Sequence, residues 1–225
     1  MSSELARKFL DIRARIGVAA AGSPATLVAV SKTQPAAAVR DLQALGQTIF
    51  GENYVQEALA KMADLADCAI EWHLIGPLQS NKCREVAEHF DWLQTLDRAK
   101  LIPLLARHRP QGLAPLNVLI QVNIDDEESK SGVAPAAVAA LAAVVTAEPA
   151  LRLRGIMSIP RPWPEEERRR AAFARLHAVF EDLRRLHPAV DTLSMGMSED
   201  FELALQEGAT MVRIGSALFG ARSRT

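Results

Sequence analysis

The sequence of 225 residues contains only two cysteines, Cys68 and Cys83, and they do not form a C-x-x-C pair. Two such cysteines exclude a disulfide framework and show no metal-ligand spacing. No run of 18 apolar residues is present, which excludes a transmembrane helix. Residues 2–8 also lack the apolar stretch of a signal peptide. We therefore expect a protein of the reducing cytoplasm without a membrane partner.

An excess of charge of either sign is also missing, because 26 Lys and Arg face 27 Asp and Glu, for a net charge of −1. General nucleic-acid binders usually carry a basic excess, so we expect no nucleic-acid partner. The chain has no Gly/Ser linker, low-complexity tract or break in composition. With 49% hydrophobic and 24% charged residues, it is typical of a globular protein with a substantial core. We interpret residues 1–225 as one domain.

Short apolar segments rich in β-branched residues alternate with segments of helical spacing. The eight predicted strands are Thr26–Val30, Thr48–Gly51, Trp72–Gly76, Trp92–Leu96, Asn117–Ile124, Leu153–Ile159, Thr192–Met195 and Met211–Gly215. Strands separated by helices pair in parallel, because each crossover returns the chain to its starting edge. At about 28 residues per unit, the pattern predicts a closed (β/α)₈ TIM barrel, with 5–18 as an additional N-terminal helix. The alternative is an open doubly wound sheet, but no G-x-G-x-x-G follows the first strand.

Two helices carry more specific expectations. The clearest is predicted to begin after Trp163 with Pro164 in its first turn, to end before Pro188, and to carry the i,i+4 pairs Glu165–Arg169 and Glu166–Arg170 on its exposed side. Pro103 falls about one turn after the expected start of another helix at Asp97, so we expect a kink or a late start there.

Lys32 follows the first predicted strand, at the end of the barrel where ligands bind. The chain uses 6 lysines against 20 arginines, so a cation placed here as Lys suggests chemistry that a guanidinium cannot perform. A desolvated amine has a lowered pKa and can condense with an aldehyde to give a Schiff base. The alternative is a lysine that extends from a strand end into solvent, and the sequence leaves both interpretations open.

The ends of the last two strands resemble a phosphate site. Loops at these positions of a TIM barrel frequently bind phosphate. Gly215 and Ser216 offer small residues, amides and a hydroxyl, while Ser194 and Gly196 stand on the neighbouring strand end. Ser198 is as compatible with a helix cap as with a ligand, and Gly215 is also compatible with a simple turn.

Other polar residues allow two interpretations each. His73 is either a core histidine or a residue of the binding pocket. Asn53 and Asn123 are either turn residues or pocket donors. The acidic run 125–128 favours a solvated loop over a metal cage, and Trp163 lies in either a lid or a stiff exposed loop.

Six segments together resemble one family. They are Ala29-Val30-Ser31-Lys32-Thr33, Gly51-Glu52-Asn53-Tyr54-Val55-Gln56-Glu57, Trp72-His73-Leu74-Ile75-Gly76-Pro77-Leu78-Gln79-Ser80-Asn81-Lys82, Ser129-Lys130-Ser131-Gly132, Leu193-Ser194-Met195-Gly196-Met197-Ser198 and Val212-Arg213-Ile214-Gly215-Ser216. In these motifs the chain is similar to the pyridoxal phosphate homeostasis proteins, single-domain relatives of the alanine racemase barrel. The resemblance extends from the first strand to the C-terminus.

The resemblance implies a cofactor and a set of residues that hold it. Pyridoxal 5'-phosphate (PLP) would be bound as an internal aldimine, a Schiff base on Lys32. Arg213 would face the pyridine nitrogen, and Asn53 and His73 would line the pocket. The phosphate would be held by Ser194, Gly196, Gly215 and Ser216.

The resemblance also implies a function in vitamin B6 homeostasis, as a PLP carrier and regulator without established turnover. Other B6 vitamers and PLP-dependent apoenzymes that accept the cofactor would be its partners. An Arg at the pyridine nitrogen would leave that nitrogen neutral and so favour holding PLP over reacting with substrate. We expect a monomer, because no exposed apolar helix face stands out in the sequence.

Three other functions remain open at this point. An amino-acid racemase needs bases on both faces of its substrate, and in the related racemases a second domain supplies a tyrosine, whereas Tyr54 is the only tyrosine here. A Schiff-base lyase acting on a sugar phosphate would use the same barrel, lysine and phosphate site. A non-enzymatic interaction module would make the polar strand ends incidental.

Overall fold

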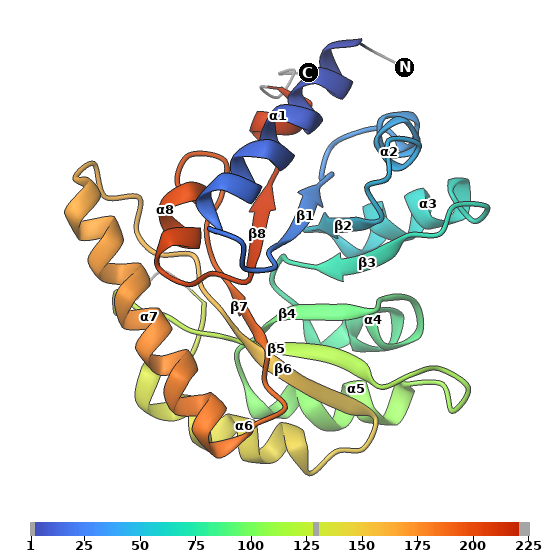
Figure 1. Ribbon diagram of the computed structural model, residues 1–225. Coiled ribbons are helices and arrows are strands. Elements are labelled where there is room, and N and C mark those ends of the chain that lie inside the picture. The colour runs from blue at the N-terminus through green and yellow to red at the C-terminus, as the bar shows by residue number, and fades with distance from the viewer. Residues whose placement is uncertain (1–2, 128–130, 221–225) are drawn as a thin grey trace.

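The computed structural model of the chain describes residues 3–127 and 131–220, and its centre is a closed barrel of parallel strands (Figure 1). The strands follow the order of the sequence around the barrel, and β1 pairs with β8 to close it. Their bounds are β1 Thr26–Val30, β2 Ile49–Glu52, β3 Glu71–Leu74, β4 Trp92–Leu96, β5 Leu116–Gln121, β6 Leu151–Met157, β7 Thr192–Ser194 and β8 Met211–Ile214. The predicted TIM barrel is confirmed.

Helices follow the strands and cover the outside of the barrel. The α-helices are α1 Ser3–Ala19, α2 Ala36–Gln43, α3 Val55–Asp64, α4 Cys83–His89, α5 Ile102–His108, α6 Val138–Thr146, α7 Glu166–Leu186, α8 Phe201–Gln206 and α9 Ser216–Phe219. Three short 3₁₀ segments, η1 Ser80–Lys82, η2 Ala99–Leu101 and η3 Pro135–Ala137, precede α4, α5 and α6. Among the described residues, no helix combines the length and the apolar character needed to cross a bilayer.

The first helix, α1, precedes β1 and packs against α8 and α9, the last helices of the chain. Its buried residues Phe9, Ile12 and Ile16 recur at the spacing of one helix face. The beginning and the end of the described chain are therefore joined twice, once through this helix and once through the β1–β8 pairing.

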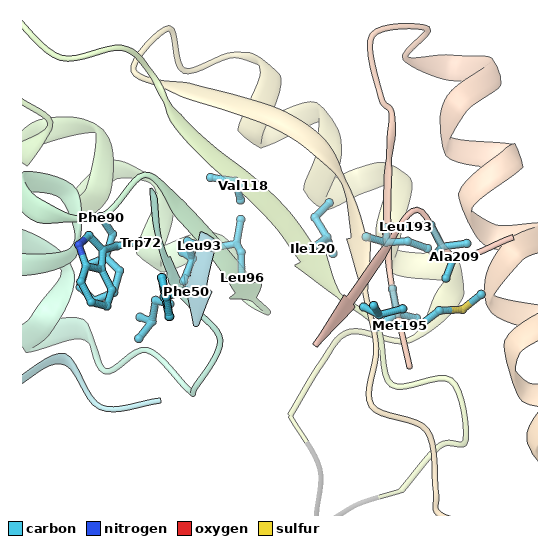
Figure 2. Packing of buried hydrophobic residues seen from close by; sticks show 14 of the residues in the cluster. Phe50, Trp72, Phe90, Leu93, Leu96, Val118, Ile120, Leu193, Met195 and Ala209 are labelled. Carbon is cyan, nitrogen blue, oxygen red and sulfur yellow. The ribbon is translucent and has the colours of Figure 1, made fainter. Parts of the chain in front are cut away.

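The main hydrophobic layer lies between the strands and the helices (Figure 2). In it, Phe50 of β2 and Trp72 of β3 lie with their ring centroids 6.1 Å apart. A second, smaller cluster includes Val28, Trp92 and Met211. Successive side chains of a strand point to opposite faces, so Trp92 and Gln94 of β4 share one face.

The two specific helix expectations have different outcomes. Helix α5 begins at Ile102, one residue before Pro103, which confirms the late start, since proline is tolerated in a first turn. In α7 the pair Glu166–Arg170 is present at 3.2 Å. The predicted side-chain pair Glu165–Arg169 is wrong: the Glu165 carboxylate lies 3.9 Å from Arg168, because Glu165 is the N-cap residue and its side chain leaves an extended backbone.

Candidate functional site

A cavity of about 330 Å³ opens at the carboxyl ends of the barrel strands. It brings together five of the residues predicted from the sequence, Lys32, Asn53, Arg213, Gly215 and Ser216. Its volume lies within the range of roughly 300–1,000 Å³ that is usual for small-molecule sites. Side chains from both sides of the β1–β8 seam therefore meet in one place.

Lys32 is half-buried and lies in a tight turn directly after β1. The amide of Gln34 closes this turn by donating to the carbonyl of Ser31 at 3.0 Å. Thr33 has a φ of +63°, a left-handed conformation that β-branched residues rarely adopt. Strain of this kind persists only where neighbouring contacts enforce it, and it is concentrated at functional sites.

Those contacts come from a charged cluster of Lys61, Glu52 and Glu57, in which Lys61 and Glu52 are buried and Glu57 is partly exposed. Lys61 Nζ donates to Glu52 Oε1 at 2.8 Å, to Glu57 Oε1 at 2.7 Å and to the carbonyl of Ser31 at 2.6 Å. Ser31 Oγ donates to Glu52 Oε1 at 2.6 Å, and the amide of Thr33 donates to Glu57. The cluster thus fastens the residues on both sides of Lys32 and fixes the direction in which the lysine leaves the strand.

Glu52 is fully buried, and burial raises its pKa although Lys61 and Ser31 stabilise the charged form. Its second oxygen, Oε2, is buried without a hydrogen-bond partner. A buried carboxylate of this kind depends strongly on its ammonium partner.

Arg213 lies on β8, and its guanidinium is buried at the inner wall of the cavity. Nη1 donates to Ser194 Oγ at 2.7 Å and Nη2 donates to the carbonyl of Ser158 at 3.0 Å. Burial lowers the pKa of Arg213 to about 10, so the side chain remains a cation at neutral pH. Two neutral oxygens therefore orient a charged group that borders the cavity.

The strand end after β8 presents backbone amides to the cavity. The amides of Gly215 and Ala217 donate to Ser198 Oγ at 3.4 and 3.3 Å. Ser198 also lines the cavity, so its hydroxyl marks an acceptor position that two amides share. Helix α9 carries no acidic residue in its first turn, which leaves this position suited to an anion.

Two acidic residues directly follow Ser198 in the chain. Glu199 and Asp200 line the same cavity, and burial raises the pKa of Asp200. Asp200 Oδ1 accepts a hydrogen bond of 2.7 Å from the amide of Met197. Asp200, and not Ser198, is the N-cap residue of α8, so the capping interpretation of Ser198 does not hold.

Three of the predicted residues, His73, Ser194 and Gly196, are not among those that line the cavity. His73 and Ser194 are fully buried in the barrel and use their polar atoms there. Gly196 has a φ of +91°, and a Cβ atom at this position would lie 2.6 Å from Cβ of Ala204 on α8. Its carbonyl accepts a hydrogen bond from the amide of Arg213. The geometry gives these three residues supporting positions behind the cavity.

A second cavity of about 290 Å³ adjoins the first and shares Asn53, Ile75 and Ile159 with it. Asn123 lines this second cavity, but its amide bonds the backbone of Glu127 through both of its polar atoms, as a turn residue does. Ser131 of the family motif also lines it, whereas Ser129 and Lys130 lie outside the described residues.

The acidic run and the Trp163 segment both differ from a simple exposed loop. The side chain of Asp125 is buried and pairs with Arg175 at 2.8 Å, while Glu128 lies outside the described residues. Within residues 3–127 and 131–220, no group of three or more His, Cys, Asp or Glu side chains is placed to hold a metal ion. The guanidiniums of Arg161 and Arg168 lie over the Trp163 ring, 4.8 and 4.9 Å from its centroid, and the neighbouring Pro162 lines the first cavity.

Some residues that shape the site were missed from the sequence. Gln94 is a polar residue within the buried strand β4. A polar side chain in a buried strand needs a hydrogen-bond partner, so its position in the sequence could have indicated a role in the barrel interior. Lys61 follows Glu57 by four residues on α3, which predicts only a surface pair. Its burial and its bonds to the Lys32 turn depend on contacts between distant elements.

Comparisons with known proteins give consistent results. The family model described as "Alanine racemase, N-terminal domain" matches residues 10–223. The "Pyridoxal phosphate homeostasis protein" of Pseudomonas aeruginosa is 55% identical over 225 residues, covering 98% of this chain and 96% of the relative. The protein of the same name from Escherichia coli K12 is 49% identical over 228 residues, covering 98% of this chain and 97% of the relative.

A solved structure extends the comparison to the cofactor. The structure of PipY from Synechococcus elongatus with PLP bound is similar to this chain with a TM-score of 0.85 and 36% identity. The similarity covers 96% of this chain and 100% of the PipY chain.

Proposed function

This chain belongs to the pyridoxal phosphate homeostasis protein family, and we propose that it holds PLP covalently on Lys32 in the cavity at the mouth of the barrel. The family membership agrees with the resemblance seen in the sequence motifs, and with it the alanine-racemase type of barrel is confirmed. The chain is a PLP-binding protein that acts in PLP homeostasis.

The observation that supports the proposal is the meeting of three kinds of group in one cavity. Lys32 brings an amine, Arg213 a buried guanidinium, and the segment after β8 two amides that already share the oxygen of Ser198. These groups fit an aldehyde, a pyridine nitrogen and a phosphate, which are three of the polar groups of PLP. Gly215 lets the segment after β8 lie close to β1, because a Cβ atom there would lie 3.2 Å from both the carbonyl oxygen and Cβ of Val30.

When bound, PLP supplies an aldehyde that reacts with primary amines and a ring that withdraws electrons. Lys32 would hold the cofactor through its amine, which would condense with the aldehyde and release water. The Lys61 cluster holds the turn so that Lys32 extends into the cavity. Arg213 would donate to the ring nitrogen and leave it unprotonated, which would weaken the electron withdrawal that catalysis requires.

We assign the chain a role as carrier and regulator without turnover. Tyr54, the only tyrosine, is 60% exposed and is not among the residues that line either cavity. Its position supports the absence of the second base that a racemase needs. The role further implies PLP-dependent apoenzymes as acceptors, other B6 vitamers as ligands, and a cytoplasmic monomer. Steady interconversion of D- and L-amino acids by the purified protein would contradict the assignment.

The test of the covalent site is borohydride reduction of the PLP-loaded protein followed by peptide mapping. We expect a pyridoxyl adduct on Lys32 and on none of the other five lysines. Lys32→Ala should abolish the adduct, while Lys100→Ala, at an exposed lysine, should retain it. An adduct at another lysine, or colourless protein that does not take up PLP, would contradict the proposal.

A further inference from the structure

Five polar side chains form an unbroken chain of hydrogen bonds through the interior of the barrel. It starts at Glu71, the first residue of β3, whose side chain is 42% exposed. His73 Nε2 lies 2.8 Å from Glu71 Oε1, and Gln94 Nε2 lies 2.8 Å from His73 Nδ1. Ser194 Oγ donates to Gln94 Oε1 at 2.7 Å, and Arg213 Nη1 donates to Ser194 Oγ at 2.7 Å. We refer to these five residues as the barrel relay.

In the barrel relay, the donors and acceptors allow only one assignment of which group donates in each hydrogen bond. A carboxylate accepts but does not donate, so Glu71 places the imidazole proton on Nε2 of His73. Burial lowers the pKa of His73, which keeps the ring neutral and leaves Nδ1 as an acceptor. Gln94 must then turn its NH₂ group to His73 and its oxygen to Ser194.

This assignment determines whether Ser194 Oγ presents a lone pair or a proton to Arg213. The hydroxyl proton is committed to Gln94 Oε1, so a lone pair of Ser194 Oγ faces the guanidinium. If the Gln94 amide were reversed, its NH₂ group would donate to Ser194 and the hydroxyl proton would be displaced toward the cation. The bond that orients Arg213 therefore depends on residues two and three steps away.

Burying the polar side chains of the barrel relay costs free energy that an apolar core would not cost, so a purely structural role does not explain them. Buried polar groups are more expensive than an apolar core of similar shape unless each is fully bonded. His73 is also held by stacking on Trp92, with ring centroids 4.9 Å apart and planes 11° apart. Within the described chain, the two side-chain bonds of Arg213 go to neutral oxygens, and Asp200 contributes a favourable charge interaction without an ion pair. The neutral acceptors fix the position of the guanidinium without neutralising its positive charge, which therefore acts on the cavity.

We propose that Glu71, His73 and Gln94 are positioning residues for Arg213, and that they control PLP binding although they do not line the cavity. The inference rests on the proposed function, because its consequence is read from the bound cofactor. Without Gln94 the Ser194 hydroxyl can rotate. The Arg213 guanidinium is then no longer held in the orientation in which it would meet the PLP ring.

The experiment compares Gln94→Met with Gln47→Met. Methionine has similar length but bonds neither His73 nor Ser194. Gln47 is a matched control, since it is a buried glutamine that donates to the carbonyls of Leu27 and Ile49 and has no bond to the barrel relay. We expect Gln94→Met to weaken PLP binding about tenfold or more and to shift the absorption maximum, because the Ser194 hydroxyl that orients Arg213 loses its own acceptor. Gln47→Met should lower stability similarly but leave affinity within about twofold and the spectrum unchanged.

Two further variants test the direction of the barrel relay. His73→Gln can donate to Glu71 and accept from Gln94, so it should retain near-normal affinity and spectrum. Glu71→Gln, at a half-exposed position that tolerates change, no longer imposes the tautomer of His73 and should weaken PLP binding in the same sense as Gln94→Met. This variant also serves if Gln94→Met does not fold.

NMR of the cofactor-free protein separates failure of this proposal from failure of the proposed function. The wild-type protein should show a neutral His73 ring protonated at Nε2 and slowly exchanging guanidinium signals from Arg213. Gln94→Met should lose these guanidinium signals even if the wild-type protein proved unable to bind PLP. Unchanged guanidinium signals in Gln94→Met, or unchanged affinity and spectrum where wild type binds PLP, would overturn the proposal. Equal spectral shifts in Gln47→Met would do the same.

Discussion

Nζ of Lys61 lies 2.8 Å from Oε1 of Glu52, and both side chains are buried beside the turn that carries Lys32. A buried ion pair is weak evidence for stability, because removing two charges from water offsets much of their attraction. Here the pair has a second task, since the same ammonium holds the carbonyl of Ser31 and the carboxylate of Glu57, which accepts from Thr33. It connects the stability of the fold to the position of Lys32.

Lys61→Met should destabilise the protein by about 3–5 kcal/mol, because it leaves the Glu52 carboxylate buried without its partner. The free energy of unfolding from denaturant titration measures this, and PLP uptake should weaken in parallel. The double variant Lys61→Met/Glu52→Gln should recover part of the stability, since the unpaired charge is removed. Equal losses in the single and double variants would contradict this account.

Gly196→Ala should lower the melting temperature by several degrees. Alanine at a φ of +91° is strained, and its Cβ would overlap Ala204 on α8, which together should cost about 2–4 kcal/mol. Gly17→Ala is the matched control, because Gly17 is exposed in α1 with no heavy atom near its Cβ position. That substitution should stabilise the helix by about 0.5–1 kcal/mol. A stable Gly196→Ala protein would show that α8 moves freely.

Arg213→Glu should change the absorption and reactivity of bound PLP, because a carboxylic acid or carboxylate at this position favours a protonated ring nitrogen. Arg213→Lys keeps the charge but cannot bond Ser194 and Ser158 as a planar fork does, so it should weaken binding with a smaller spectral change. Absorption spectra and PLP titration of both variants measure the effect. Spectra identical to wild type would count against a contact between Arg213 and the ring.

The buried imidazole of His73 should make stability depend on pH. Burial lowers the pKa of His73 in the folded state. The unfolded chain therefore binds a proton at a pH at which the folded chain does not, and stability is lost as pH falls below the ordinary pKa of 6.5. Between pH 7 and 5.5 the wild-type protein should lose about 1 kcal/mol more than His73→Gln, which has no titrating group at this position. Denaturant titrations at the two pH values test this difference. Parallel losses in both proteins would indicate that His73 is protonated in the fold.

The barrel could be predicted from the sequence because each strand and helix carries its own periodic pattern. Strands β1 and β4 have the predicted bounds, and the others shift by one to three residues at their ends. Shifts of this size arise because strand ends depend on pairing with neighbours rather than on local pattern. Strand β6 begins at Leu151, earlier than predicted, because Arg152 interrupts the apolar run although its backbone pairs with Asn117 of β5.

The site was predictable where polar residues stand at strand ends, as Lys32, Asn53 and Ser216 do. The supporting residues were not, because their roles depend on which side chains meet across the barrel. Nothing near Ser194 in the sequence indicates that its hydroxyl lies between Gln94 and Arg213, which are 100 and 19 residues away. A motif therefore identifies the residues of a site more readily than it divides them between contact and support.

The seam between β1 and β8 determines when the cofactor pocket can exist during synthesis. Any nascent chain that stops before residue 211 has two open sheet edges, β1 and β7, and lacks the guanidinium and amides that complete the pocket. The pairing of residue 26 with residue 211 spans most of the polypeptide, and pairings this far apart in sequence are intrinsically slow to form. The pocket with all of its polar groups is therefore complete only when β8 has joined β1.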